Sequence, residues 1–248
     1  MPASAQQALF LHGWAANRHV FDDFLPRLPE FHCHAPDLPG HGEAAFGGTF
    51  DAKRIADDLA ADITVPQHVF GWSLGGYIAL LLAIRHPHAV RSLTLCASFA
   101  RYGAAEDYAA GVVNPPTAKM ADLFAQDFTH HMTQFLHLQS LYAPETQPRF
   151  QALAAKLTAN GMPSALYAAQ AAVLESDVRA LLPEIRQPVL LLFARKDRVT
   201  PPSMGEYLQQ HLTHAELHLL TRSAHMPFVS EAENCAELVR DFWCRAGK

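Results

Sequence analysis

Cysteine is scarce in this sequence, and the cysteines that it has are scattered. Four occur among 248 residues, and no two of them form a C-x-x-C pair: Cys33, Cys96, Cys235 and Cys244. Disulfide frameworks and cysteine-rich zinc sites both need cysteines at short, regular spacings. The pattern therefore argues against both classes and favours reduced thiols in a cytoplasm.

Long apolar runs and an excess of charge are missing as well. No run reaches the roughly 18 apolar residues of a membrane-spanning helix, and the first residues, "MPASAQQALFLHGW", lack the basic and apolar regions of a secretory signal. Charged residues make up 17% of the chain and the formal net charge is -5, which gives no sign of nucleic-acid binding. We expect a monomeric cytoplasmic protein that binds neither membranes nor nucleic acid.

What is present is an alternation of short apolar runs with helical patterns. Half of the residues are hydrophobic, and 248 residues suffice for one large domain with a substantial core. Five runs are typical of buried strands, each followed by turn residues or a helix: residues 8–14, 68–73, 90–98, 188–197 and 215–225. Ser230 and Glu233 have the spacing of a capping box at the start of the last helix. The predicted fold class is α/β, with a mostly parallel sheet covered by helices on both faces.

Residues 99–183 follow a different pattern, because they contain no convincing strand and are rich in residues at helical spacing. Several large apolar side chains of this segment can fall along one broad helical face: Phe124, Phe128, Phe135, Leu138 and Tyr142. We expect a helical cap inserted between two strands of a core domain that comprises residues 1–98 and 184–248. The alternative is that the apolar stripe only packs down onto the core, as amphipathic stripes usually do.

The stretch "FGWSLGG" places Ser73 between two glycines, where an apolar extended run meets an apolar helical run. Gly71 and Gly75 stand two residues on either side, which is the G-x-S-x-G pattern of a sharp turn from strand to helix. Such a turn strains the serine backbone, exposes the hydroxyl and leaves no room for side chains at the glycine positions. We predict that Ser73 is a catalytic nucleophile; the alternative is a small residue at a tight turn.

A serine nucleophile needs a base, and the base needs an acid that orients it. In this strand-turn-helix architecture the acid and then the histidine follow the serine, each at the end of a strand. Asp197 directly follows the run "PVLLLFARK", and His225 follows "AELHLLTRSA". The chain has 15 histidines, but only His225 combines a strand end with an upstream strand-end Asp. Asp37 also stands at a strand end, but it precedes the serine and is expected to order a turn.

Two backbone N–H groups are predicted to bind the oxyanion. Leu74 follows the nucleophile at a helix start, where its N–H has no helical acceptor, and a glycine lets the loop after the first strand bring the N–H of Trp14 close. His12 is expected to hydrogen-bond this loop. His32 and His34 share one strand face, but no third ligand is evident, so no metal is predicted.

The segments "LHGW", "DLPGHG", "GWSLGG", "ARKDRVTP" and "SAHMPF" together resemble the α/β-hydrolase superfamily along nearly the whole chain. Within that superfamily, the chain is similar to the pimeloyl-acyl-carrier-protein methyl ester esterases of biotin synthesis. Three features carry this closer similarity: Trp14 and Trp72 in "HGW" and "GWSLGG", the cap sequence "FLHLQ", and "LESDVR" with "RQPVL" after the cap. The hexamer "GWSLGG" is fairly specific, whereas the cap match is shorter and less so.

The resemblance implies an α/β-hydrolase fold and a serine carboxylesterase that removes methanol from a pimeloyl methyl ester carried on acyl carrier protein. It implies no metal and no cofactor. Trp14, Ser73 and Leu74 are expected to contact the ester. Five residues of the cap are expected along the acyl chain: Phe135, Leu136, His137, Leu138 and Gln139.

Members of this family dock an acidic carrier protein with arginines of the cap, and here the match is incomplete. Residues 99–183 hold five basic and seven acidic residues, and Gln134 and His130 stand near where such arginines are expected. A basic patch around Arg149 and Lys156 is the remaining candidate, with the neighbouring histidines adding charge at lower pH. The carrier protein is an expected partner whose docking residues stay open.

The triad alone does not select a substrate, since one fold hosts many reactions. A broad short-chain carboxylesterase, a thioesterase, a lactonase and an acyltransferase all fit it. Short chains are expected, because bulky Phe and Met side chains of the cap predict a narrow pocket. The alternative of another class is a non-catalytic small-molecule receptor, which would need none of the three catalytic side chains.

Overall fold

Six strands form one parallel sheet in the described part of this protein. The computed structural model describes residues 6–247, and the strand order is β2-β1-β3-β4-β5-β6 with every neighbouring pair parallel. The strands are β1 Gln6–Leu11, β2 Phe31–His34, β3 Gln67–Trp72, β4 Val90–Cys96, β5 Val189–Ala194 and β6 Ala215–Leu220. The predicted α/β class is confirmed, and each of the five predicted runs overlaps one strand. Residues 1–5, part of the stretch considered for a secretory signal, lie outside the described residues.

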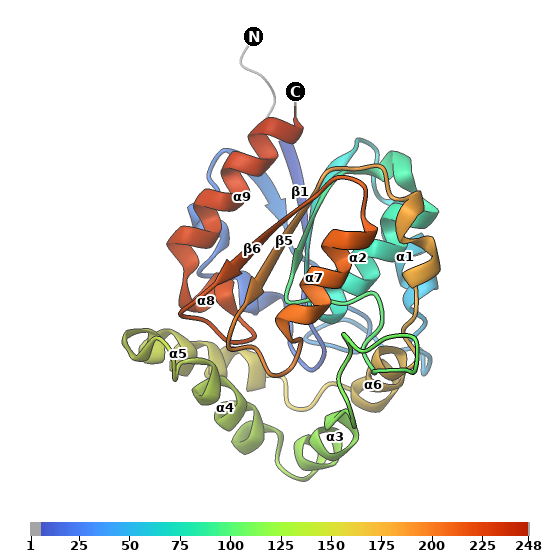
Figure 1. The fold of residues 1–248 in the computed structure, drawn as a ribbon. Helices are drawn as coiled ribbons and strands as arrows, with labels where there is room; N and C mark the ends of the chain where they lie inside the picture. Colours follow the sequence, from blue (N-terminus) through green and yellow to red (C-terminus); the bar gives the residue numbers. More distant parts are fainter. Residues whose placement is uncertain (1–5, 248) are drawn as a thin grey trace.

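Helices cover both faces of the sheet (Figure 1). One face carries α1 (Ala52–Ala61), α2 (Leu74–Arg85) and α7 (Pro202–His211), and the other carries α8 (Pro227–Ser230) and α9 (Ala232–Ala246). Strand β1 shows why both faces are covered. Phe10 packs in the hydrophobic cluster on the side of α9, while Leu9 and Leu11 pack in the hydrophobic cluster on the side of α2. Successive strand residues point to opposite faces, so a sheet buried on both sides needs strands that are apolar throughout.

A long helical segment lies between β4 and β5. It contains α3 Thr117–Gln126, α4 Phe128–Gln139, α5 Gln147–Thr158 and α6 Leu166–Leu174. Figure 1 shows these four helices gathered at the end of the sheet where β5 and β6 end, away from the two chain termini. We call residues 99–183 the helical insertion. In the described structure it adds no strand to the sheet, and its isolated β-bridges join residues of the insertion to one another. It therefore covers the edge at which the predicted catalytic residues stand.

Short 3-10 helices complete the described elements. They are Arg18–Phe21, Leu25–Arg27, Pro87–Ala89, Pro144–Thr146 and Arg179–Glu184. Among residues 6–247, no helix combines the length and the apolar character that crossing a membrane requires.

The apolar stripe predicted along one helical face is interrupted. Asp127 has an extended backbone, and its carboxylate accepts the N–H of His130 at 2.9 Å, so α3 ends and α4 begins there. Phe124 and Phe128 are buried on either side of this junction, whereas Leu138 is 54% exposed. The prediction of one continuous face is wrong, because aspartate favours the N-cap of a new helix over a helix interior.

The last helix starts differently from the prediction. Ser230 is the final residue of α8, and its hydroxyl donates to the carbonyl of Met226 at 3.1 Å. Helix α9 begins at Ala232, and Glu233 pairs with Arg27 at 3.0 Å. The helix itself is confirmed, but the capping box is wrong because Ser230 already belongs to a preceding helical turn.

Candidate active site

The turn between β3 and α2 holds Ser73 in a strained backbone conformation. Its φ of 54° and ψ of -119° lie outside the regions that residues with a side chain usually adopt. A Cβ on Gly75 would overlap the carbonyl oxygen of Leu11, and one on Gly71 would overlap the backbone of Gly76. Close backbone approach thus requires both glycines of the motif, and the sharp turn predicted from the sequence is present.

Asp197 and His225 form a buried pair in the loops that follow β5 and β6. His225 Nδ1 lies 2.9 Å from Asp197 Oδ2, and the two residues are 3% and 2% exposed. The carboxylate also accepts the N–H of Val199 at 2.7 Å, and the N–H and hydroxyl of Thr200 at 2.9 Å and 2.7 Å. These donors satisfy the buried charge. Because Nδ1–H donates to Asp197, Nε2 of His225 is left as the nitrogen that can accept a proton.

The backbone of His225 is held from both the core and the helical insertion. Trp72 Nε1 donates to the His225 carbonyl at 2.9 Å, and Gln139 Oε1 accepts the His225 N–H at 2.9 Å. Gln139 is only 5% exposed, and its Nε2 donates to the carbonyl of Phe135 at 3.0 Å. The position of the histidine therefore depends on the residue before Ser73 and on the last residue of α4.

Ser73 and His225 line the same small cavity, here called the inner cavity. It measures about 40 Å³, and Trp14 and Trp72 also line it. Within the described residues no hydrogen bond joins Ser73 Oγ to His225 Nε2; such contacts are often long before substrate binds. A larger hollow of about 450 Å³, here called the outer groove, adjoins the inner cavity. The two share four lining residues: Met120, Phe124, Phe135 and Val199.

Two backbone N–H groups beside the serine are suited to bind an oxyanion. Helix α2 begins at Leu74, so the Leu74 N–H has no acceptor within the helix. Trp14 lies in a tight turn in which Ala15 has a φ of 60°. A Cβ on Gly13 would lie 3.2 Å from Cβ of Ser73, so this turn lies directly against the serine. The geometry supports the oxyanion roles predicted for Leu74 and Trp14.

His12 is a fully buried residue that holds the turn of Trp14. Its Nδ1–H donates to the Gly13 carbonyl at 2.8 Å, and its Nε2 accepts the N–H of Leu38 at 2.9 Å. Burial, together with the neighbouring His41, lowers the pKa of His12 to about 3. The ring is therefore neutral with both nitrogens engaged, and it has none left for proton transfer.

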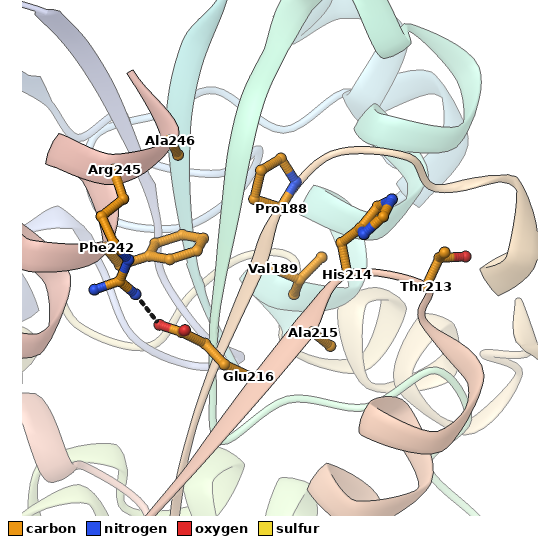
Figure 2. Close-up of a pocket in the computed structure, with 9 residues that line it drawn as sticks. All are labelled: Pro188, Val189, Thr213, His214, Ala215, Glu216, Phe242, Arg245 and Ala246. Atoms are coloured by element: carbon orange, nitrogen blue, oxygen red, sulfur yellow. Dashed lines mark hydrogen bonds and ion pairs between the residues drawn. The ribbon is translucent and has the colours of Figure 1, made fainter. Parts of the chain in front are cut away.

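A second hollow lies at the opposite end of the strands and lacks this chemistry (Figure 2). It measures about 380 Å³ and is lined by the first residues of β5 and β6, Val189 and Ala215, and by Phe242 of α9. Its charged side chains, Glu216 and Arg245, pair with each other at 2.6 Å. None of its lining residues is a serine, a cysteine or an aspartate. Residues 6–247 also contain no group of three or more side chains suited to hold a metal ion.

The chain is similar to known proteins over nearly its whole length. The pattern of the alpha/beta hydrolase fold family matches residues 9–232. A pimeloyl-[acyl-carrier protein] methyl ester esterase of Neisseria meningitidis is 49% identical over 243 residues, covering 98% of this chain and 95% of that protein. An esterase of the same name from Chromobacterium violaceum is 35% identical over 227 residues, covering 91% and 89%. The chain belongs to the α/β-hydrolase family of these esterases.

Solved esterase structures share the fold of this α/β hydrolase. An esterase from Exiguobacterium antarcticum superposes with a TM-score of 0.86 at 24% identity, covering 96% of this chain and 92% of that one. An esterase from Thermogutta terrifontis superposes with a TM-score of 0.81 at 21% identity, covering 98% and 91%. At these identities the similarity concerns the fold alone. The predicted α/β-hydrolase fold and the resemblance to the methyl ester esterases are both confirmed.

The cap residues that were predicted along the acyl chain do not share one surface in this α/β hydrolase. Phe135 lines the inner cavity and, together with Leu138 and Gln139, the outer groove. Leu136 is 1% exposed and packs in the core, while His137 lines a separate hollow between α4 and α5. Positions i, i+3 and i+4 share one face of a helix, so residues 135, 138 and 139 face the outer groove together. Leu136 and His137 line neither the inner cavity nor the outer groove.

The basic side chains of the patch considered around Arg149 and Lys156 form ion pairs with acidic residues outside the helical insertion. Arg149 lies 3.3 Å from Glu233 and 3.8 Å from Asp23, and Lys156 Nζ lies 2.7 Å from Asp22. A cation that already pairs with a carboxylate attracts a further anion only weakly. The structure thus does not support this pair as a free patch for an acidic partner.

The motifs do not single out several residues that shape the site. Thr200 donates to Asp197 and lies 3.2 Å from His225 Nδ1. Its place three residues after the aspartate, in "DRVT", is the local signal that could have identified it. Lys196 and Arg198 flank Asp197 and line the outer groove. Nothing in the sequence alone shows that they face this groove.

Proposed function

We propose that this α/β hydrolase cleaves the methyl ester of pimeloyl-acyl carrier protein into methanol and the free pimeloyl acid on its carrier. The observation that carries the proposal is the buried Asp197–His225 pair, whose histidine lines the inner cavity together with the strained Ser73. This geometry supports acyl transfer through the serine. The relatives at 49% and 35% identity are named for this reaction, and the pimeloyl group in the proposal is taken from their names.

In the first half of the reaction, His225 Nε2 takes the proton of Ser73 while the serine oxygen attacks the ester carbonyl. The carbonyl electrons move onto oxygen, and the N–H groups of Trp14 and Leu74 bind this oxyanion; each such donor is worth about 10²–10³ in rate. Asp197 stays ionised and stabilises the protonated imidazole. The intermediate then collapses, and the methoxy group leaves as methanol with the proton from His225.

In the second half, water releases the acyl group from Ser73. His225 takes a proton from the water, whose oxygen attacks the acyl carbonyl and forms a second oxyanion in the same site. Collapse of this intermediate returns the proton to Ser73 and frees the acid. The acyl chain extends from the inner cavity into the outer groove, whose apolar lining includes Phe135 and Leu138.

The helical insertion is proposed to act as the cap of this site. Trp14 Nε1 donates to the carbonyl of Leu166 in α6 at 2.8 Å, and Gln139 of α4 accepts the N–H of His225. The insertion is thus bonded to both the oxyanion turn and the catalytic base. Residues 99–183 form this cap, and residues 6–98 and 184–247 form the core in the described part of the chain.

The test compares kcat/KM for methyl esters, acyl thioesters and lactones of matched chain length. We expect the methyl esters to be preferred, and Ser73→Ala to lower kcat by about 10⁶ because the nucleophile is lost. Ser164→Ala serves as the control, since Ser164 donates only a 3.4 Å hydrogen bond to Gly40 outside the site. A folded Ser73→Ala variant with most of its activity contradicts the triad. A strong preference for thioesters or lactones contradicts the methyl esterase assignment.

A further inference from the structure

The outer groove has an apolar rim that is exposed. Leu138, Leu141 and Tyr142 line the groove and are 54%, 53% and 43% exposed. Large apolar side chains that are exposed together mark interaction surfaces, whereas single ones are common on any protein. In the proposed function the acyl chain runs from Ser73 through the inner cavity into this groove, which places the carrier end of the chain at this rim.

The charged side chains that line the outer groove are both cationic. They are Lys196 and Arg198, which are exposed on either side of the buried Asp197. Within residues 6–247 neither forms an ion pair, and Lys196 Nζ lies 5.8 Å from the ring centre of Tyr142. The Asp197 carboxylate bonds to Thr200 and His225 and, in the described structure, forms no ion pair with either cation. A chain with a net charge of -5 thus presents local positive charge beside its active site.

The cations of the helical insertion are engaged elsewhere. Four of its five basic side chains form ion pairs in the described structure: Arg101, Arg149, Lys156 and Arg179. Lys119 is the fifth, and it does not line the outer groove. The cations that line the outer groove and have no carboxylate partner therefore belong to the loop after β5.

We propose that Lys196 and Arg198, with the apolar rim of Leu138, Leu141 and Tyr142, form the docking surface for the acidic face of the acyl carrier protein. This inference rests on the proposed function, since that function names the carrier. Charge complementarity selects an anionic partner and speeds its association. The exposed leucines and the tyrosine supply the apolar contact that an interface needs beside its charges.

The contribution of two exposed cations is modest and sensitive to salt. Ion pairs at an interface rim act mainly on association, and they weaken as the ionic strength rises. We expect loss of both cations to lower kcat/KM for the carrier-bound ester by about tenfold at low salt, mainly through KM. Near 1 M salt, where the screening length falls to about 3 Å, the difference from wild type should vanish.

The experiment uses two substrates with the same seven-carbon chain, the methyl ester of pimeloyl-acyl carrier protein and dimethyl pimelate, which is neutral and has no carrier. The double variant Lys196→Ala with Arg198→Ala is expected to lose about tenfold in kcat/KM on the first at low salt and to recover near 1 M salt, with a smaller loss on the second that does not depend on salt. The matched control is Lys53→Ala with Arg186→Ala, which removes two exposed cations that do not line the groove. It should behave as wild type on both substrates.

The other possible outcomes show whether the docking surface or the proposed function is wrong. Equal losses on both substrates overturn the docking role, because the two cations then support the loop of Asp197. An unimpaired double variant overturns it as well, and so does an equal loss in the control. If wild type hydrolyses dimethyl pimelate but not the carrier-bound ester, the proposed function fails first and the docking surface fails with it.

Discussion

On the core side of the active-site groove the polar groups are buried and hydrogen-bonded, whereas on the side of the helical insertion most groups are apolar and several are exposed. Asp197 is 2% exposed and fully satisfied, while Leu138 is 54% exposed. Gln139 is the exception, because it is a buried polar residue of the insertion that bonds to His225. This contrast is consistent with the proposed function, in which the loops after the strands provide the chemistry and the helices bind the acyl group.

The largest effect is expected on the core side, from Asp197→Asn. An amide does not hold the Nδ1–H tautomer of His225 or stabilise its protonated form, so kcat should fall by about 10⁴ while the fold persists. The measurement is kcat on a methyl ester, with circular dichroism to verify folding. Asp241→Asn, on the exposed side of α9, is the control and should leave kcat unchanged. A folded Asp197→Asn variant within tenfold of wild type would contradict the role of the pair.

Gln139→Leu tests whether the insertion reaches into the chemistry. It leaves the buried His225 N–H without its acceptor, at a cost of about 1–3 kcal/mol, so kcat should fall by about tenfold. The pH profile of kcat should also shift, because the histidine is no longer held in place. Gln134→Leu, on the same helix but without a bond to His225, is the matched control. If only KM rises in Gln139→Leu, then Gln139 contacts the acyl chain instead of positioning the histidine.

Phe135→Ala probes the apolar side of the groove, where a smaller effect is expected. The side chain lines both the inner cavity and the outer groove, so its loss weakens binding of the chain in ground and transition states alike. KM should rise about threefold to tenfold for longer acyl esters, with kcat nearly unchanged. Kinetics across methyl esters of increasing length measure this. His137→Ala, which faces another hollow, should change neither constant, and an equal effect there would contradict the assignment of the helix face.

The last prediction concerns stability in acid and has the smallest effect on activity at neutral pH. The free energy of unfolding should fall as the pH drops. Burial lowers the pKa of His12 to about 3 and those of His41 and His68 to about 4, and all three lie in the core. Between pH 6.5 and about 4 the unfolded chain therefore binds more protons than the folded one, so the free energy of unfolding should fall as the pH drops through this window. Urea unfolding at several pH values measures it. His68→Gln should flatten the slope, and a pH-independent stability would contradict the buried neutral rings.

The residues of the proposed triad could be picked out from the sequence because each carries a local signal. Ser73 has its two glycines, and Asp197 and His225 each follow an apolar run and precede a turn. The parallel sheet brings the ends of its strands to one edge, so three local signals suffice to predict one site. The same apolar runs predicted five of the six strands in the described part of the chain, all but β2.

The surroundings of the site could not be predicted, because they depend on contacts between distant residues. Arg149 and Lys156 pair with acids more than 80 positions away, and no local pattern reveals that. The face that α4 turns to the groove depends on where the helix begins, which the side chain of Asp127 decides. Gln139 likewise meets His225 only after the insertion has folded onto the core.

The central claim is that Ser73 is the nucleophile of this α/β hydrolase, and covalent labelling tests it most directly. The protein is treated with a fluorophosphonate, digested, and its peptides are weighed by mass spectrometry. We predict one adduct, on Ser73, formed rapidly in wild type, slowly in Asp197→Asn and not at all in Ser73→Ala. A folded wild-type protein that forms no adduct, or forms it on another residue, would contradict the claim.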